Sequence, residues 1–212
     1  RDFCLSRGLG DVYKRQLLSL LFAMIIGMIF ALMNVGRNRV LNCIGTIYVD
    51  AVRGVPLIVL AYFIYFGVPS GMKMMGATDF RLSALQAGTI ALAMNCGAYM
   101  AEIIRAGIQS VDKGQMEASR SLGLSYAKSM RLVILPQAIR TMVPSIINQF
   151  IITLKDTSIL SVIGFPELVN TAKNVVANTM SAFQVWTIVA VMYLVVITQL
   201  SRLAKKVERR LN

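Results

Sequence analysis

The chain has 212 residues, of which 56% are hydrophobic and only 15% are charged, and its mean hydropathy is +0.64; this composition excludes an ordinary water-soluble domain and indicates that lipid surrounds most of the chain. The formal charge is +12, from 22 Lys and Arg against 10 Asp and Glu. The basic residues lie between long apolar runs rather than across one polar surface, so the charge argues against a nucleic-acid-binding protein.

The first sixteen residues, 1–16, differ from everything that follows. They are polar, basic and contain glycine, and the sequence becomes apolar abruptly at Leu17. Residues 11–16 resemble the translation of a common sequencing-library adapter. We therefore expect residues 1–16 to be a foreign or artefactual tail, and residues 17–212 to form a single transmembrane domain.

Five apolar segments predict an all-α fold, a polytopic membrane bundle of about five transmembrane helices. The segments cover residues 17–33, 47–68, 82–104, 142–154 and 183–200. Asp50, Arg53 and Pro56 interrupt the second segment. Because proline kinks a helix, we favour helix shaping or gating over ligand binding for Arg53, Gly54 and Pro56.

The third segment carries polar side chains on one helix face. Asn95, Tyr99 and Glu102 follow each other at steps of four and three residues, so all three are predicted to look into the bundle and to line a substrate pathway. An ionised Glu in hydrocarbon costs about 2.5 to 3.5 kcal/mol unless it is paired or wetted. Two interpretations stay open for Glu102: a structural ion pair with Arg105 or Arg53, or binding of a substrate ammonium group.

The fourth segment offers a second set of pathway candidates. Asn148 and Gln149 lie within it and Lys155 follows it. Hydrogen bonds between helices explain the two amides equally well, and Lys155 can extend its charge to the interface. Pro136, which lacks a backbone donor, predicts a stop or kink before this segment.

A polar stretch at about 110–136 separates the third and fourth segments and carries helix signals. Asp112, followed three residues later by Gln115, resembles a capping box that begins a helix. Gly123 can adopt the left-handed conformation that ends it, and Ser125 can begin a second helix. The stretch therefore predicts a hairpin of two short helices.

The hairpin also carries the spacing of a known motif. Glu117-Ala118-Ser119 is followed by Gly123 and, after nine further residues, by residues 133–136, which resembles the EAA loop of binding-protein-dependent ABC importer permeases. The third residue departs from the usual Ala by one hydroxyl group. By this resemblance, the residues that couple the chain to an ATPase are Gly114, Glu117, Ala118, Ser119, Gly123, Leu135 and Pro136.

Three further segments resemble the polar amino acid branch of that family. They are RGVPL at 53–57, GAYMAEI at 97–103 and KDTS at 155–158. The resemblance extends from about residue 17 to the end. It implies a permease subunit that forms the pathway by alternating access in the lipid bilayer, with separate ABC ATPase subunits, a second permease chain that is a copy or a paralogue, and an extracytoplasmic amino-acid-binding protein as partners.

The distribution of Lys and Arg predicts how the chain crosses the membrane. Cytoplasmic loops carry an excess of basic residues. If the C-terminus is inside, most basic loop residues fall on the cytoplasmic side, among them Lys113, Arg120, Lys128, Arg131 and those of the segment 202–210. We predict a multi-pass protein of the bacterial cytoplasmic (inner) membrane, with its N-terminus outside and its C-terminus in the cytoplasm.

Other classes of membrane protein would require other sequence features. A membrane enzyme needs a catalytic constellation, but the chain has no His and no clustered carboxylates at one depth, so we expect no catalysis and no metal or cofactor in this chain. It also has no P-loop string, which places ATP and Mg in the partner ATPase. A secondary carrier, or another transporter subunit that is not coupled to an ATPase, stays the alternative.

Overall fold

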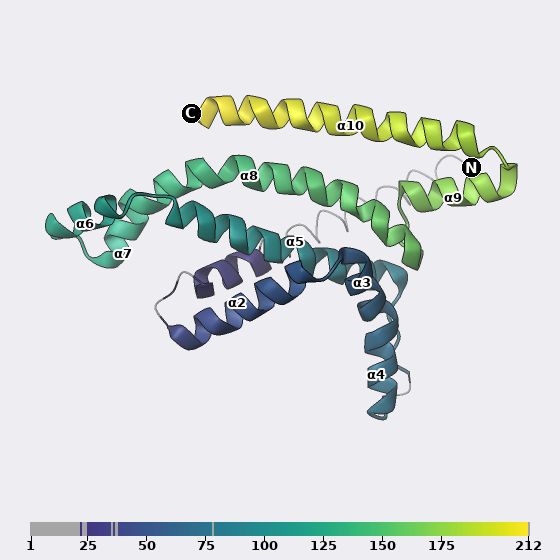
Figure 1. The fold of residues 1–212 in the computed structure, drawn as a ribbon, viewed down its shortest axis with the longest axis horizontal. Coiled ribbons are helices and arrows are strands. Elements are labelled where there is room, and N and C mark those ends of the chain that lie inside the picture. Colours follow the sequence, from purple (N-terminus) through teal and green to yellow (C-terminus); the bar gives the residue numbers. More distant parts are fainter. Residues whose placement is uncertain (1–21, 23–24, 35, 37, 78, 212) are drawn as a thin grey trace.

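The computed structural model describes the chain except residues 1–21, 23–24, 35, 37, 78 and 212, so the predicted tail at 1–16 lies outside the described residues. Every regular element in the described part is helical (Figure 1), which confirms the predicted all-α fold. The helices are α2 (Arg39–Gly54), α3 (Leu57–Tyr62), α4 (Val68–Met74), α5 (Ala84–Gln109), α6 (Lys113–Ser121), α7 (Tyr126–Ser129), α8 (Leu135–Asp156), α9 (Leu168–Thr179) and α10 (Ala182–Leu211). Two π-helical turns, Phe63–Gly67 and Met130–Ile134, and a 3-10 turn, Thr157–Ile163, join some of them.

Four continuous helical stretches are long and apolar enough to cross a membrane. They are Leu57–Met74, Ala84–Gln109, Tyr126–Ile163 and Ala182–Arg209. A shorter apolar helix, Ile25–Asn34, overlaps the second half of the first predicted segment, 17–33. Together these agree with the predicted bundle of about five membrane helices.

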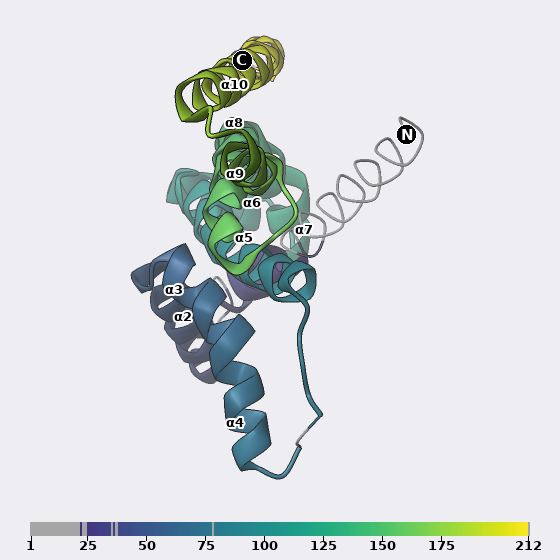
Figure 2. The same cartoon turned by 90° about the vertical axis from the view of Figure 1, so that its right-hand side faces the viewer.

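Helix α5 lies at the centre of the bundle. It packs against α2 and α3 on one side and against α8 on the other, and Figures 1 and 2 show α10 outside α8 as the outermost layer. The side chains of α5 that meet these neighbours are small: Ala87, Ala91, Ala98 and Ala101 are fully buried. Small side chains let helix backbones approach closely, which is how helices associate in lipid.

The second predicted segment is broken where its proline requires it. Helix α2 ends at Gly54, Val55 has an extended backbone (φ −104°, ψ 130°), and α3 begins at Leu57 after Pro56. Proline disfavours the helical conformation of the residue before it. The segment that turns away as α3 and α4 (Figures 1 and 2) therefore runs over Leu57–Met74, which corrects the predicted 47–68.

Of the two outcomes predicted at Pro136, a stop or a kink, the stop is wrong, because the helix continues through this residue. Pro136 occupies the first turn of α8, directly after the π-helical turn Met130–Ile134. There the N–H of Leu135 donates to the carbonyl of Met130, five residues back. This wider turn accommodates the proline, so the continuous helical stretch that contains the predicted fourth segment, 142–154, runs over Tyr126–Ile163 and includes α7.

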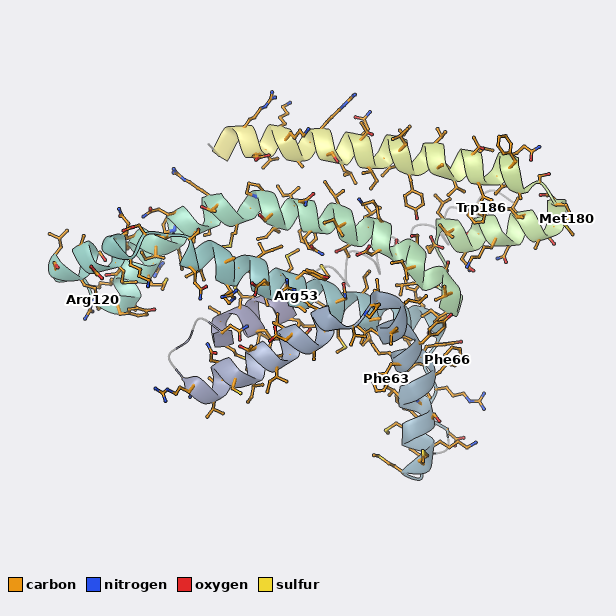
Figure 3. All side chains as sticks on the ribbon, in the orientation of Figure 1. Arg53, Phe63, Phe66, Arg120, Met180 and Trp186 are labelled. Atoms are coloured by element: carbon orange, nitrogen blue, oxygen red, sulfur yellow. The ribbon has the colours of Figure 1, made fainter. Side chains whose placement is uncertain are left out.

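The bend between α3 and α4 and the outer face of α10 expose large apolar side chains. Phe63 and Phe66 are exposed on the π-helical turn (Figure 3), as are Phe183 and Leu194 on α10. In water such surfaces would be unfavourable, but in a bilayer the lipid chains are as apolar as the side chains. These faces are the ones expected to meet lipid or another membrane chain.

Candidate functional site

The polar hairpin has the local structure that its sequence predicts. Asp112 caps α6, its Oδ1 accepting from the N–H of Gly114 at 2.7 Å, although no reciprocal bond from the Gln115 side chain occurs among the described residues. Gly123 has a φ of +84°, in the left-handed region. Ser125 caps α7, its Oγ accepting from the N–H of Lys128 at 3.4 Å. Helix α7 is short and continues through the π-helical turn into α8.

The tip of the hairpin presents charge and apolar surface together. Glu117 and Ala118 are exposed, Leu122 is 84% exposed, and Ser119 is buried with its hydroxyl donating to the carbonyl of Met116 at 2.9 Å. A Cβ on Gly114 would lie 2.7 Å from Asp112 Oδ1, so glycine there leaves room for the cap. Glu117 and Leu122 are therefore both accessible at the tip.

One apolar cluster joins the base of this hairpin to the membrane helices. It contains Ile104 and Ile108 of α5, Ile134 of the π-helical turn, and Ala138 and Met142 of α8. Met116, Met130, Val133 and Leu135 pack against it from the hairpin side. The hairpin and the adjoining ends of α5 and α8 therefore share one packed apolar cluster. Pro136 lies exposed beside it.

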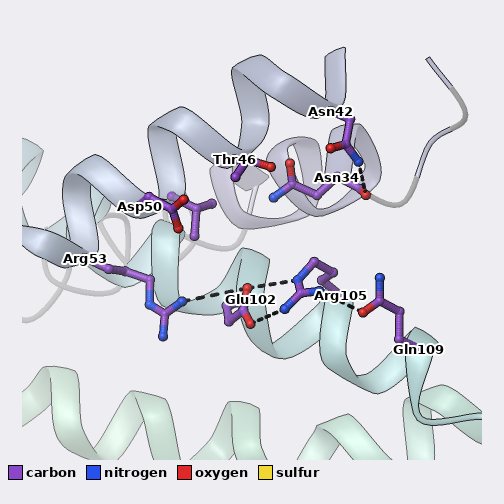
Figure 4. Close-up of a pocket in the computed structure, with 9 residues that line it drawn as sticks. Asn34, Asn42, Thr46, Asp50, Arg53, Glu102, Arg105 and Gln109 are labelled. Atoms are coloured by element: carbon purple, nitrogen blue, oxygen red, sulfur yellow. Dashed lines mark hydrogen bonds and ion pairs between the residues drawn. The ribbon is translucent and has the colours of Figure 1, made fainter. Parts of the chain in front are cut away.

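Glu102 pairs with two arginines (Figure 4). Its Oε2 accepts from Arg105 Nε at 3.0 Å, its Oε1 accepts from Arg105 Nη2, and Arg53 Nη1 lies 3.8 Å from Oε2. Arg105 Nη1 donates further to Gln109 Oε1 at 2.7 Å. The structure thus contains the ion pair that one of the two interpretations of Glu102 required, while its binding of a substrate stays a prediction.

These charges line a cavity of about 370 Å³ between α2 and α5. The polar lining residues are Asn34, Asn42, Thr46, Asp50, Arg53, Glu102, Arg105 and Gln109. Sequence reasoning treated Asp50 only as an interruption of a span. The signal that points to it is the step of four residues from Asn42 to Thr46 to Asp50, which places a polar stripe on one face of α2.

The other predicted pathway residues are divided between two places. Tyr99 lies beneath Arg53, whose guanidinium carbon is 5.3 Å from the ring centroid, within range of a cation–π contact. Asn95 and Gln149 are buried. Gln149 Nε2 donates to Thr153 Oγ1 at 3.4 Å, and this hydroxyl donates to Cys96 Sγ at 3.3 Å, so the amide belongs to the α5–α8 contact.

Lys155 lies away from Glu102. It lines a more open groove of about 600 Å³ between α8, α9 and α10, together with Ser158, Trp186 and Tyr193. Asn148 is exposed on α8. The structure therefore does not bring Lys155 into the cavity that holds Glu102, although both were predicted to serve one pathway.

A carboxylate that sequence reasoning missed caps α9. The oxygens of Glu167 accept from the backbone N–H groups of Val169, at 2.7 Å, and of Asn170, and the Tyr193 hydroxyl lies 3.5 Å from Oε2. Burial raises the pKa of the Glu167 carboxyl above its usual value of 4.5, and these hydrogen bonds lower it by less.

No group of three or more His, Cys, Asp or Glu that could hold a metal ion occurs in the part of the chain that the structure describes.

An apolar helical bundle with a capped polar hairpin between two of its long helices is the architecture of a polytopic membrane protein. Comparison with known protein families identifies the chain more closely. Residues 23–212 match the family described as the binding-protein-dependent transport system inner membrane component. The chain belongs to this family, which confirms the resemblance to ABC importer permeases.

Several known proteins resemble the chain over nearly its whole length. It is 40% identical over 197 residues to the probable glutamine ABC transporter permease protein GlnM of Bacillus subtilis, and 36% identical to the glutamine transport system permease protein GlnP of Escherichia coli K12; each match covers 93% of this chain and 88% of the relative. A crystal structure of an amino acid ABC transporter with histidines superposes with a TM-score of 0.86 at 39% identity, covering 94% of this chain and 90% of that one. The inward-facing MetNI methionine ABC transporter shares the fold, with a TM-score of 0.76 at 19% identity.

Proposed function

We propose that this permease subunit belongs to an ATP-driven importer of polar amino acids and that glutamine is the first substrate to test. Two relatives named as glutamine permeases, at 40% and 36% identity, support this substrate class. The segments at 53–57, 97–103 and 155–158, which resemble the polar amino acid branch, also support it. The chain itself supplies a path and no covalent chemistry, and ATP with Mg is bound and hydrolysed by separate ABC ATPase subunits.

The observation that carries the coupling mechanism is the anchored hairpin. Its tip offers Glu117 and the exposed Leu122 to an ATPase groove, while its base shares an apolar cluster with α5 and α8. Closure of the ATPase subunits on ATP would displace the tip, and the packed base would carry the displacement into both membrane helices. Of the predicted coupling residues, Gly114 and Gly123 shape the hairpin, Ser119 fixes α6, and Leu135 and Pro136 form the joint with α8.

The proposed assembly contains two permease chains, either two copies or this chain with a paralogue, and an extracytoplasmic binding protein that delivers the amino acid. The hairpin and the C-terminal end of α10 lie toward the same end of the bundle (Figure 1), as the proposal that both are cytoplasmic requires. Asn95, Tyr99, Glu102, Asn148, Gln149 and Lys155 stay candidates for the pathway.

Reconstitution tests this function against the alternative. The complete complex in proteoliposomes should accumulate labelled glutamine only with ATP and binding protein, and vanadate should stop uptake. A secondary carrier would instead import without the ATPase and lose activity when ionophores collapse the ion gradients. ATP-independent, ionophore-sensitive uptake by this chain alone would therefore refute the proposal.

A further inference from the structure

The segment Phe63–Met75, which we call the arm, has little packing against the rest of the bundle. It consists of the first π-helical turn, α4 and the residue that follows α4. Of its residues, all of which the structure describes, only Ile64 is buried, and α4 packs mainly on the π-helical turn before it. Together with α3 the arm is long and apolar enough to cross a membrane, but its packing is not that of a membrane-crossing helix.

Helices α2 and α3, which precede the arm, already lie along α5 and run in the opposite direction. Val49 of α2 shares an apolar cluster with Ala101 and Ile104, in the second half of α5. Leu60 of α3 shares another cluster with Ala87, in the first turn of α5. The chain therefore moves along α5, away from the hairpin, before it reaches the arm.

The two helices are together long enough for one crossing. They extend from Arg39 to Tyr62, which is about 35 Å along a helix, and the hydrocarbon core is about 30 Å thick. The charge of Arg53 does not prevent this crossing, because its guanidinium is paired with Glu102 of α5. A charge that faces a partner inside the bundle is tolerated at such a depth.

The arm leaves the bundle at the level of the membrane surface. Its one buried side chain, Ile64, belongs to the same cluster as Ala87, three residues after the start of α5. Helix α5 is 26 residues long, about 38 Å, which exceeds the hydrocarbon core of about 30 Å, so its first turn lies near the interface. This end of α5 is opposite the hairpin, which follows the other end.

A local feature of the sequence turns the arm away from the bundle. The N–H of Val68 donates to the carbonyl of Phe63, five residues back, and Pro69 follows directly. A widened turn beside a proline bends a helix. Figure 1 shows α4 running across the direction of α5, α8 and α10, and in Figure 2, where α10 is seen nearly end-on, α4 still shows its length. Helix α4 therefore lies along the plane of the membrane and not through it.

The side chains of the arm suit the boundary between lipid headgroups and acyl chains. Phe63 and Phe66 are 62% and 58% exposed (Figure 3), and Met74 at the far end is 88% exposed. Lys73 is exposed in the last turn of α4. Helices that lie in the interface bury aromatic and aliphatic side chains about 5–10 Å deep, while a Lys extends its charge to the headgroups.

We propose that the arm is an interfacial anchor that binds phospholipid at the end of the bundle opposite the hairpin, which is the outer leaflet in the predicted orientation. Its aromatic and thioether side chains contact the upper acyl chains, and Lys73 contacts the phosphate groups. The membrane is crossed by α2 and α3 instead of by Leu57–Met74. This inference goes beyond the proposed function, because it holds whichever amino acid the complex carries.

Depth-dependent fluorescence quenching of the complete complex in nanodiscs tests the anchor. A fluorescent amino acid is incorporated by amber suppression in place of Phe66 or, separately, Met74. The nanodiscs contain phospholipids that carry a nitroxide either on the headgroup or near the end of an acyl chain, and iodide is the quencher in water. Val59, half-exposed on α3 and about 10 Å along the helix from Phe66, is the matched control for a deeper position.

The two arm positions should lie at one shallow depth. Both should lose more fluorescence to the headgroup nitroxide than to the chain-end nitroxide, and the label at Val59 should show the reverse order. Stronger quenching of the Met74 label by the chain-end nitroxide would overturn the anchor, because α4 would then enter the hydrocarbon core. Quenching of that label by iodide alone, or by none of the three, would also overturn it, since water or protein would cover the arm. Met74 has so little packing that its replacement decides the question even if the Phe66 variant fails to assemble.

Discussion

Replacement of Gly123 by Val isolates the contribution of the hairpin's left-handed residue. Gly123 has a φ of +84°, and a Cβ there would meet nothing within 4 Å. The cost of a side chain is therefore backbone strain alone, about 1–2 kcal/mol, which lowers the population of the native turn about 5- to 30-fold. Uptake per ATP hydrolysed in proteoliposomes should fall, because a hairpin that leaves its native turn no longer transmits closure of the ATPase.

Gly76 provides a control with the same local strain at another place. It lies in the loop after α4, has a φ of +94°, and its Cβ would also meet nothing within 4 Å. Gly76→Val should therefore cost a similar free energy but leave uptake per ATP unchanged, and Gly123→Asn should be milder than Gly123→Val because Asn tolerates the left-handed region. Normal coupling in Gly123→Val, or an equal loss in Gly76→Val, would refute the reasoning.

Other side chains give separate tests of the packing, read by thermal unfolding of the complex in nanodiscs. Glu102→Gln should destabilise it by about 1–3 kcal/mol, because two arginines lose a charged acceptor; an unchanged unfolding temperature would contradict the pairing. Ser129→Ala should be neutral or stabilising, since the Ser129 hydroxyl is fully buried without a partner in the described part of the chain. Ser119→Ala should instead cost about 0.5–1.5 kcal/mol, because the hydrogen bond of its hydroxyl is lost. A larger loss of stability in Ser129→Ala than in Ser119→Ala would be inconsistent with the structure. The raised pKa of Glu167 means that its stabilising contribution is fully present below the usual value of 4.5 and is lost as the pH rises through the raised pKa, and Glu167→Gln should flatten that part of the pH profile.

Local signals in the sequence predicted the hairpin well because the interactions that form it are local. A cap joins Asp112 to a backbone N–H two residues on, and another joins Ser125 to one three residues on. The left-handed turn at Gly123 depends on that residue's own missing side chain. The same locality explains the break at Pro56, since proline restricts the residue directly before it.

The same reasoning left two outcomes open at Pro136, because both satisfy the local rule. A proline can end a helix, or the helix can widen by one residue per turn and continue. Here the turn at Met130–Ile134 is packed between α5 and the hairpin through Ile134. Those contacts are distant in sequence, so periodicity and proline chemistry alone did not distinguish the two outcomes.

By itself, the sequence determined that the chain is a helical membrane bundle, where most of its spans lie, and that a capped hairpin separates two of them, because length, apolarity and capping are properties of contiguous residues. Tertiary structure decided which side chains meet: that Glu102 is occupied by Arg105, that Lys155 faces α10 and not the charged cavity, and that Asp50 and Asn34 share that cavity. Helical periodicity assigns a residue to a face of its own helix, but the neighbour on that face is chosen by how the helices pack.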